Sequence, residues 1–150
     1  MHVLIVEDDD LRRFKTRRLL QRHGCAVLEA ATGEQAVELL RAAPAPLVVL
    51  LDYLLPEMQD YRLLRQIEAD PELAERHLFL VMSAHPALVE LPLPHLGGRW
   101  MRLLRKPFDI AGFRAAVALA SRRPKAEVVS LHRAATSGQQ AASAGRQTRR

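Results

Sequence analysis

Residues 3–9 have the sequence Val-Leu-Ile-Val-Glu-Asp-Asp, four apolar residues followed at once by three acids. A short apolar run rich in β-branched residues is typical of a strand buried on both faces of a parallel sheet. Similar runs occur at residues 47–51 and 78–82, and two weaker candidates lie at residues 26–28 and 100–104. The sequence therefore predicts five short strands.

Segments with helical spacing separate these runs. Leu11, Phe14 and Leu19 share one arc of the first segment, and Gly24 closes it as a helix-terminating glycine would. Strands that alternate with helices indicate a parallel sheet covered on both sides, because crossovers between parallel strands are almost always right-handed. The predicted class is α/β.

Capping residues mark where two later helices begin. Thr32 with Gln35 forms a capping-box pattern, and Asp109 is a good N-cap, with Phe108 and Phe113 placed as a hydrophobic staple across it. A further helix is expected over residues 61–69, before Pro71, and the last helix is expected to end by Pro124.

Length and composition favour one globular domain. The chain has 150 residues, of which 49% are hydrophobic, enough for a single core. Cys25 is its one cysteine, so neither an intramolecular disulfide nor a cysteine-rich zinc site is expected. The apolar start is too short for a signal peptide or a membrane span, which predicts a cytoplasmic protein without membrane contact.

The basic character of the chain is concentrated near its C-terminus. The formal net charge is +5, and residues 124–150 carry five basic residues against one acid, which leaves +1 for residues 1–123. We therefore predict a folded domain over residues 1–123 and a basic, disordered tail over residues 124–150, with no DNA-binding face on the domain.

Five polar residues follow the predicted strands. Glu7 and Asp8 come after the first strand, Asp52 after the third, Ser83 after the fourth and Lys106 after the fifth. In an open parallel sheet these positions meet at one edge, where ligands bind. Three carboxylates there would repel one another unless a hard cation such as Mg²⁺ lay among them. A carboxylate, a metal, a lysine and a hydroxyl are together sufficient for phosphoryl transfer.

Each of these residues also has a purely structural explanation. An acid after a strand is commonly a helix N-cap, which we expect of Asp9 or Asp10. Asp52 alone could be a solvated strand end, and a lone serine or a Lys-Pro dipeptide means little. It is the occurrence of all five at corresponding positions that favours a functional site.

The ordered motifs resemble the response-regulator receiver family of two-component signalling. Residues 3–9 look like its opening strand and acidic pair, and residues 50–58 look like its phosphoacceptor strand and loop. Residues 81–84 and 105–108 complete the set, and the resemblance covers about residues 2–122. It implies a flavodoxin-like fold with five parallel strands in the order 2-1-3-4-5.

The resemblance also implies a role for each site residue. Asp52 would accept a phosphoryl group from a sensor histidine kinase or a phosphotransfer protein. Asp8 and the main-chain carbonyl of Leu54 would bind Mg²⁺ together with Asp52, and Glu7 would bind it through water. Ser83 and Lys106 would contact the phosphoryl group, and the Lys106-Pro107 bond would be cis. Such a protein is a phosphoacceptor that signals to a downstream protein, and its only catalysis is its own phosphorylation and slow dephosphorylation.

Three departures from the family pattern bear on how a signal would leave the site. No glycine follows the phosphoacceptor loop at residues 59–61, and Leu103 replaces the usual aromatic switch residue. In the region of the fourth helix, Pro92 and Pro94 each cost about 3 kcal/mol inside a helix. The sequence therefore predicts a degraded fourth helix and a mobile loop over residues 85–98.

Two alternatives remain open from the sequence. One is a pseudo-receiver, an interaction module that keeps the pocket but signals without phosphate, which Leu103 and the broken fourth helix favour. The other is a haloacid-dehalogenase-type hydrolase with Asp52 as nucleophile. Such enzymes carry a second acid two residues after the nucleophile, and Leu54 occupies that position here.

Overall fold

The computed structural model describes residues 1–59, 62–84 and 101–122, and these contain five strands and six helices. The strands are β1 (His2–Val6), β2 (Ala26–Ala30), β3 (Val48–Asp52), β4 (Leu78–Ser83) and β5 (Met101–Arg105). The helices are α1 (Asp10–Arg22), α2 (Gly33–Ala42), α3 (Pro56–Gln59), α4 (Arg62–Glu68), α5 (Pro71–Arg76) and α6 (Ile110–Ser121).

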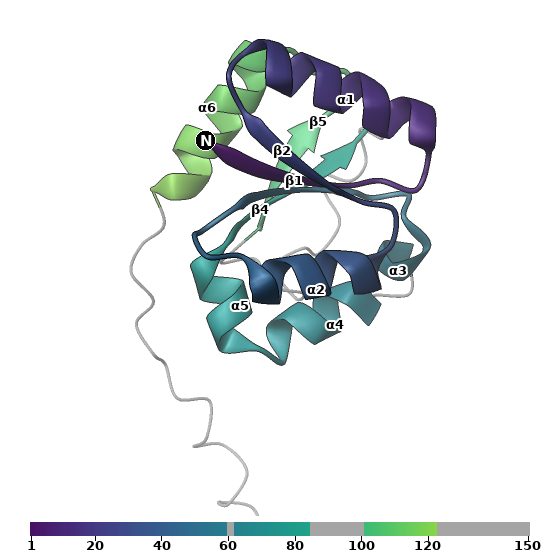
Figure 1. Ribbon diagram of the computed structural model, residues 1–150, viewed down its shortest axis with the longest axis vertical. Helices are drawn as coiled ribbons and strands as arrows, with labels where there is room; N and C mark the ends of the chain where they lie inside the picture. Colours follow the sequence, from purple (N-terminus) through teal and green to yellow (C-terminus); the bar gives the residue numbers. More distant parts are fainter. Residues whose placement is uncertain (60–61, 85–100, 123–150) are drawn as a thin grey trace, which may run out of the picture.

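All five strands are parallel and form one sheet in the order β2-β1-β3-β4-β5. Helices α1 and α6 cover one face, and α2, α4 and α5 cover the other (Figure 1). This is the predicted flavodoxin-like topology, and the predicted α/β class is confirmed. None of the helices in the described ranges is long and apolar enough to cross a bilayer.

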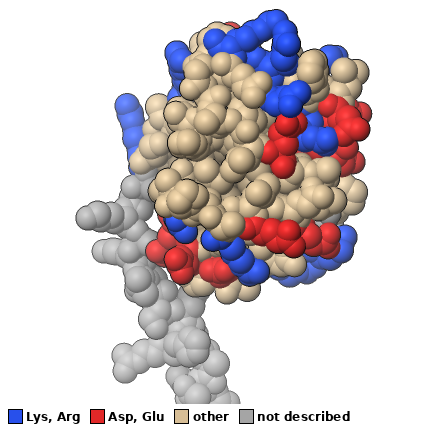
Figure 2. Space-filling view, viewed as in Figure 1, with Lys and Arg blue, Asp and Glu red and all other residues tan. Residues whose placement is uncertain are grey.

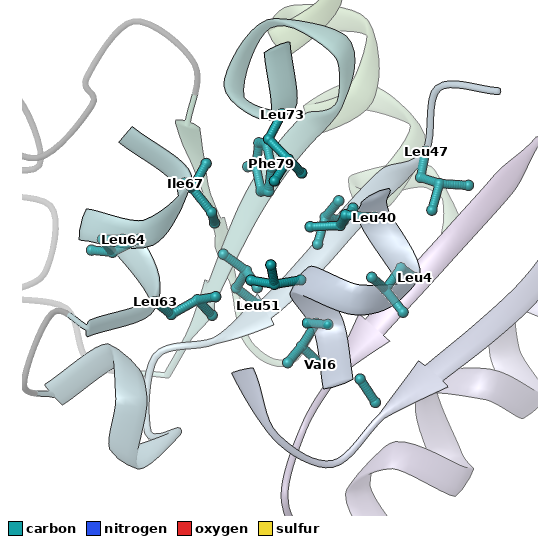
Figure 3. Packing of buried hydrophobic residues seen from close by; sticks show 14 of the residues in the cluster. Leu4, Val6, Leu40, Leu47, Leu51, Leu63, Leu64, Ile67, Leu73 and Phe79 are labelled. Carbon is teal, nitrogen blue, oxygen red and sulfur yellow. The ribbon is translucent and has the colours of Figure 1, made fainter. Parts of the chain in front are cut away.

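The central strands are buried on both faces, as their uninterrupted apolar sequences predict. Val3 to Val6 and Val49 to Leu51 have no exposed surface. Alternate residues of each strand point to opposite faces, so the core divides into two clusters. The larger lies under α2, α4 and α5, and Figure 3 shows Leu4, Val6, Leu51 and Phe79 of the sheet packing there with Leu40, Leu63, Leu64, Ile67 and Leu73 of the helices. The smaller lies under α1 and α6 and includes Ile5, Leu50, Leu20 and Phe113.

Side-chain caps fix where four helices begin. In each case the side chain of the N-cap residue accepts a hydrogen bond from a main-chain N–H in the first turn, and these residues are Asp9, Thr32, Asp70 and Asp109. The predicted caps at Thr32 and Asp109 are therefore confirmed, and of the two candidates Asp9 and Asp10 it is Asp9 that caps α1. Phe108 and Phe113 both pack in the smaller cluster, as the predicted staple requires.

The predicted apolar arc of the first helix is wrong. Leu11 and Phe14 are 61% and 44% exposed, and Leu20 is the buried residue of α1. The guanidinium groups of Arg17 and Arg18 lie over the Phe14 ring. These two side chains therefore cover part of the ring, although it lies outside the core. The end of the helix is as predicted, with Gly24 at φ +80° just after the C-cap.

The segment between β3 and β4 is more helical than predicted. The expected helix over 61–69 corresponds to α4, and α5 begins directly at Pro71, which stands in its first turn after the Asp70 cap. A proline is favoured there because that N–H has no partner within the helix. The turn at residues 60–61, the loop at 85–98 and the tail at 124–150 lie outside the described residues, so those three predictions are not tested.

Candidate functional site

The site residues lie where four adjacent strands end. Glu7 follows β1, and Asp52 and Ser83 are the last residues of β3 and β4. Lys106 follows β5, whose Arg105 is in register with Ser83. Because parallel strands end at the same edge, the fold brings these side chains together, as the sequence predicts.

Asp52 is a buried carboxylate whose two oxygens differ in their contacts, because only one of them accepts a main-chain hydrogen bond. It is 1% exposed. Its Oδ1 lies 3.0 Å from Lys106 Nζ and accepts a hydrogen bond from the Leu54 main-chain N–H at 3.2 Å. Its Oδ2 is buried and, while the neighbouring Glu7 carboxyl is ionised, accepts no hydrogen bond from any described residue. A buried carboxylate oxygen in that state is costly unless a cation or a substrate approaches it.

Glu7 shares this buried environment with Asp52. Burial, and then its hydrogen bond with Asp52, raises the pKa of Glu7 to about 7. Burial alone would also raise the pKa of Asp52, but the hydrogen bond with Glu7 and the Lys106 ammonium outweigh it, so the pKa of Asp52 lies below its ordinary value. Of the two carboxyls, Glu7 is therefore the one that takes up a proton first as the pH falls.

The acidic residues fit a small divalent cation. One carboxylate oxygen from each of Glu7, Asp8 and Asp52 lies within 4.8 Å of the others. Asp8 is on the open side of this group, with 46% of its side chain exposed. All the donors are hard carboxylate oxygens, and Asp52 has a buried Oδ2 that accepts no hydrogen bond from a described N–H group. This donor set suits Mg²⁺, which prefers a few carboxylates and keeps several of its waters.

The remaining predicted site residues lie at the same edge. Ser83 is 6% exposed, and its main-chain carbonyl accepts a hydrogen bond from the Lys106 N–H at 2.7 Å, which joins the ends of β4 and β5. Leu54 lies two residues after Asp52, with its side chain exposed. The Lys106-Pro107 peptide bond is cis, as predicted.

Arg12 is the site residue that the sequence analysis missed. It lies in the first turn of α1, and its guanidinium contacts four carboxylates, those of Glu7 at 3.2 Å, Asp8 and Asp52 at 3.6 Å and Asp9 at 3.8 Å. Figure 2 shows basic atoms among acidic atoms on the side where α1 begins. The i,i+4 spacing of Asp8 and Arg12 was a signal for the contact between these two residues. The contact with Asp52, forty residues away, depends on the fold.

Comparisons with known proteins identify the family of the fold. The model of the response regulator receiver domain family matches residues 3–118. Protein PilH of Pseudomonas aeruginosa is 33% identical over 81 residues, which cover 54% of this chain and 66% of PilH. The two-component response regulator ORR8 of Oryza sativa is 29% identical over 109 residues, which cover 73% of this chain and 88% of that protein.

Solved structures agree as well. The CheY-like receiver domain protein of Methanospirillum hungatei superimposes with a TM-score of 0.61 at 25% identity, over 80% of this chain and 94% of that one. The family match, the strand order and the four strand ends that carry the acids, the serine and the lysine all lead to one assignment. The chain belongs to the response regulator receiver domain family.

Proposed function

We propose that this receiver domain accepts a phosphoryl group on Asp52 from a sensor histidine kinase or a phosphotransfer protein in the cytoplasm, and signals by binding another protein. The observation that carries the proposal is the ion pair of 3.0 Å between Lys106 Nζ and the buried Asp52, beside the carboxylates of Glu7 and Asp8. A buried carboxylate between a lysine and a metal-binding group of acids is equipped for phosphoryl transfer.

The transfer would form one bond and break one bond. An Asp52 oxygen attacks phosphorus, the new O–P bond forms, and the N–P bond of the donor phosphohistidine breaks, which leaves the electron pair on the imidazole nitrogen. The lowered pKa of Asp52 keeps this nucleophile ionised at neutral pH. Mg²⁺ bound beside Asp52 would neutralise charge on the phosphoryl oxygens.

The other site residues would orient and stabilise the phosphoryl group. The Lys106 ammonium already lies against Asp52 Oδ1, so phosphorylation would let it pair with a phosphoryl oxygen with little movement. The buried position of Ser83 at the end of β4 supports a hydrogen bond from its hydroxyl. Asp8 and the Leu54 carbonyl would ligate Mg²⁺ directly and Glu7 through water.

A second candidate is an interaction module that does not use phosphate. The observation that favours it is Arg12, whose positive charge already pairs with the acids that would hold the metal. The two candidates differ in one measurable property, which is whether Asp52 is labelled.

The test is phosphorylation by acetyl phosphate with Mg²⁺, followed by mass spectrometry of the intact protein. We expect one phosphoryl group on the wild type and none on Asp52→Asn. Asp9→Asn is the matched control, because Asp9 is an exposed neighbour and asparagine also caps helices. Unchanged labelling of Asp52→Asn would overturn the assignment of the acceptor, and a wild type that no phosphodonor labels would favour the interaction module.

A further inference from the structure

Arg12 occupies the acidic edge in an unusual way. Its guanidinium lies within 3.6 Å of an oxygen of Glu7, Asp8 and Asp52, the same three residues whose carboxylates can gather around a cation. Its contact on Asp52 is to Oδ2, the oxygen that accepts no hydrogen bond, whereas Lys106 holds Oδ1. Arg12 therefore pairs with the same three carboxylate groups that the site offers to a metal.

The contacts of Arg12 are electrostatic and easily exchanged. Three of its four ion pairs are 3.6 Å or longer, and its Nε is buried without making a hydrogen bond to any described residue. The side chain as a whole is 42% exposed, so its outer part reaches solvent. An arginine held by charge, with few directional bonds and an open route outward, can leave when a stronger cation arrives.

We propose that Arg12 is a built-in competitor of the divalent cation: its guanidinium neutralises the acidic edge in the metal-free protein and must move away for Mg²⁺ to bind. This inference rests on the proposed function of the site. A guanidinium and a divalent cation cannot share the same carboxylates without strong repulsion. Arg12 thus sets the Mg²⁺ concentration at which the domain becomes competent for phosphorylation.

Arg12 could act on the site in two opposite ways, and the direction in which its replacement changes the Mg²⁺ affinity distinguishes them. As a competitor it weakens Mg²⁺ binding, because it adds one positive charge to the site and pairs with the carboxylates that would bind the ion. As an organiser that held the carboxylates in place it would strengthen binding instead. Its position favours competition, since its guanidinium lies within 3.6 Å of a carboxylate oxygen of each of the three residues that a cation would need.

The experiment is a titration of the full chain with MgCl₂, followed by the amide NMR signals of Tyr53 and Leu54 at constant ionic strength. We expect Arg12→Gln to tighten Mg²⁺ binding by about tenfold, because one full positive charge is lost beside the metal. Arg18→Gln is the matched control, since Arg18 is an exposed arginine of the same helix that lies over the Phe14 ring. That variant should change the affinity by less than about twofold.

A second variant separates charge from shape. Arg12→Lys keeps the charge but replaces the broad guanidinium with a compact ammonium group, which can pair with fewer carboxylates at once. Its Mg²⁺ affinity should therefore fall between those of the wild type and Arg12→Gln. Equal or weaker binding by Arg12→Gln, with its amide spectrum otherwise unchanged, would overturn the inference and leave the proposed function intact. If none of the proteins bound Mg²⁺, the metal-dependent function would fail together with it.

Discussion

The body and the end of strand β3 are equally buried and have opposite energetic consequences. Leu50 and Leu51 are fully buried among apolar neighbours, and their burial stabilises the fold by about 25 cal/mol for each Å² removed from water. Asp52 is 1% exposed, and its burial carries a desolvation cost that the hydrogen bond with Glu7 and the Lys106 ammonium have to offset. The strand body therefore maintains the structure, whereas the strand end holds a charge that the fold alone does not require.

The largest expected effect comes from the strand body. Leu50→Ala should lower the free energy of unfolding by about 3 kcal/mol, because it removes apolar contacts and leaves a cavity between the sheet and helices α1 and α6. Urea denaturation measures this change. Leu28→Ala, at a 43% exposed leucine of the edge strand β2, should cost less than about 1 kcal/mol. Similar losses of stability in the two variants would show that the buried body of β3 does not contribute more to stability than an exposed edge position.

The next effect tests the strand end. Asp8→Asn should weaken Mg²⁺ binding roughly tenfold or more, because it removes the charge of a direct ligand. Asp9→Asn should leave the affinity nearly unchanged, since Asp9 caps α1 and asparagine caps equally well. The same NMR titration measures both, and equal losses would mean that the metal-binding pair is shifted by one residue.

The smallest effect concerns a buried polar group far from the site. Burial, followed by the charge of Arg76, lowers the pKa of His77, and its Nδ1 accepts the Leu47 N–H at 3.1 Å. The unfolded chain therefore binds this proton near pH 6.5 and the folded chain only at lower pH. Stability contributed by neutral His77 is present above about pH 6.5 and is lost as the pH falls below it.

Replacing His77 with a residue that does not titrate isolates this contribution. His77→Asn places an amide oxygen near the position of Nδ1, so it can still accept the Leu47 N–H. Urea denaturation between pH 5 and 7 should show a shallower loss of stability for this variant than for the wild type. Identical slopes would show that His77 does not titrate differently in the folded and unfolded chains.

The strands and their ends were predictable from sequence because each buried run is continuous and stops abruptly at a polar residue. Glu7, Asp52 and Ser83 follow such runs, whereas Lys106 follows the interrupted and only partly buried run of β5. The parallel arrangement brings all four to one edge. The position of the site follows from these local patterns together with the rule that ligands bind at the carboxyl ends of parallel strands.

The helices were less predictable because their buried face depends on tertiary packing. Leu11 and Phe14 match a helical arc in sequence, yet Leu20 makes the core contact of α1. The position of Arg12 over Asp52 was not predictable for the same reason, since it depends on the rotation of α1 relative to β3. The signal for α5 was present in the Asp70-Pro71 pair, a cap followed by a first-turn proline, and was missed.

The most direct test of the central claim is to locate the phosphoryl group. The protein is treated with acetyl phosphate and Mg²⁺ and then reduced with borohydride, which converts an aspartyl phosphate to homoserine, and its peptides are sequenced by mass spectrometry. The account predicts homoserine at position 52 and aspartate at positions 8 and 9. Homoserine at another position, with Asp52 unchanged, would contradict it.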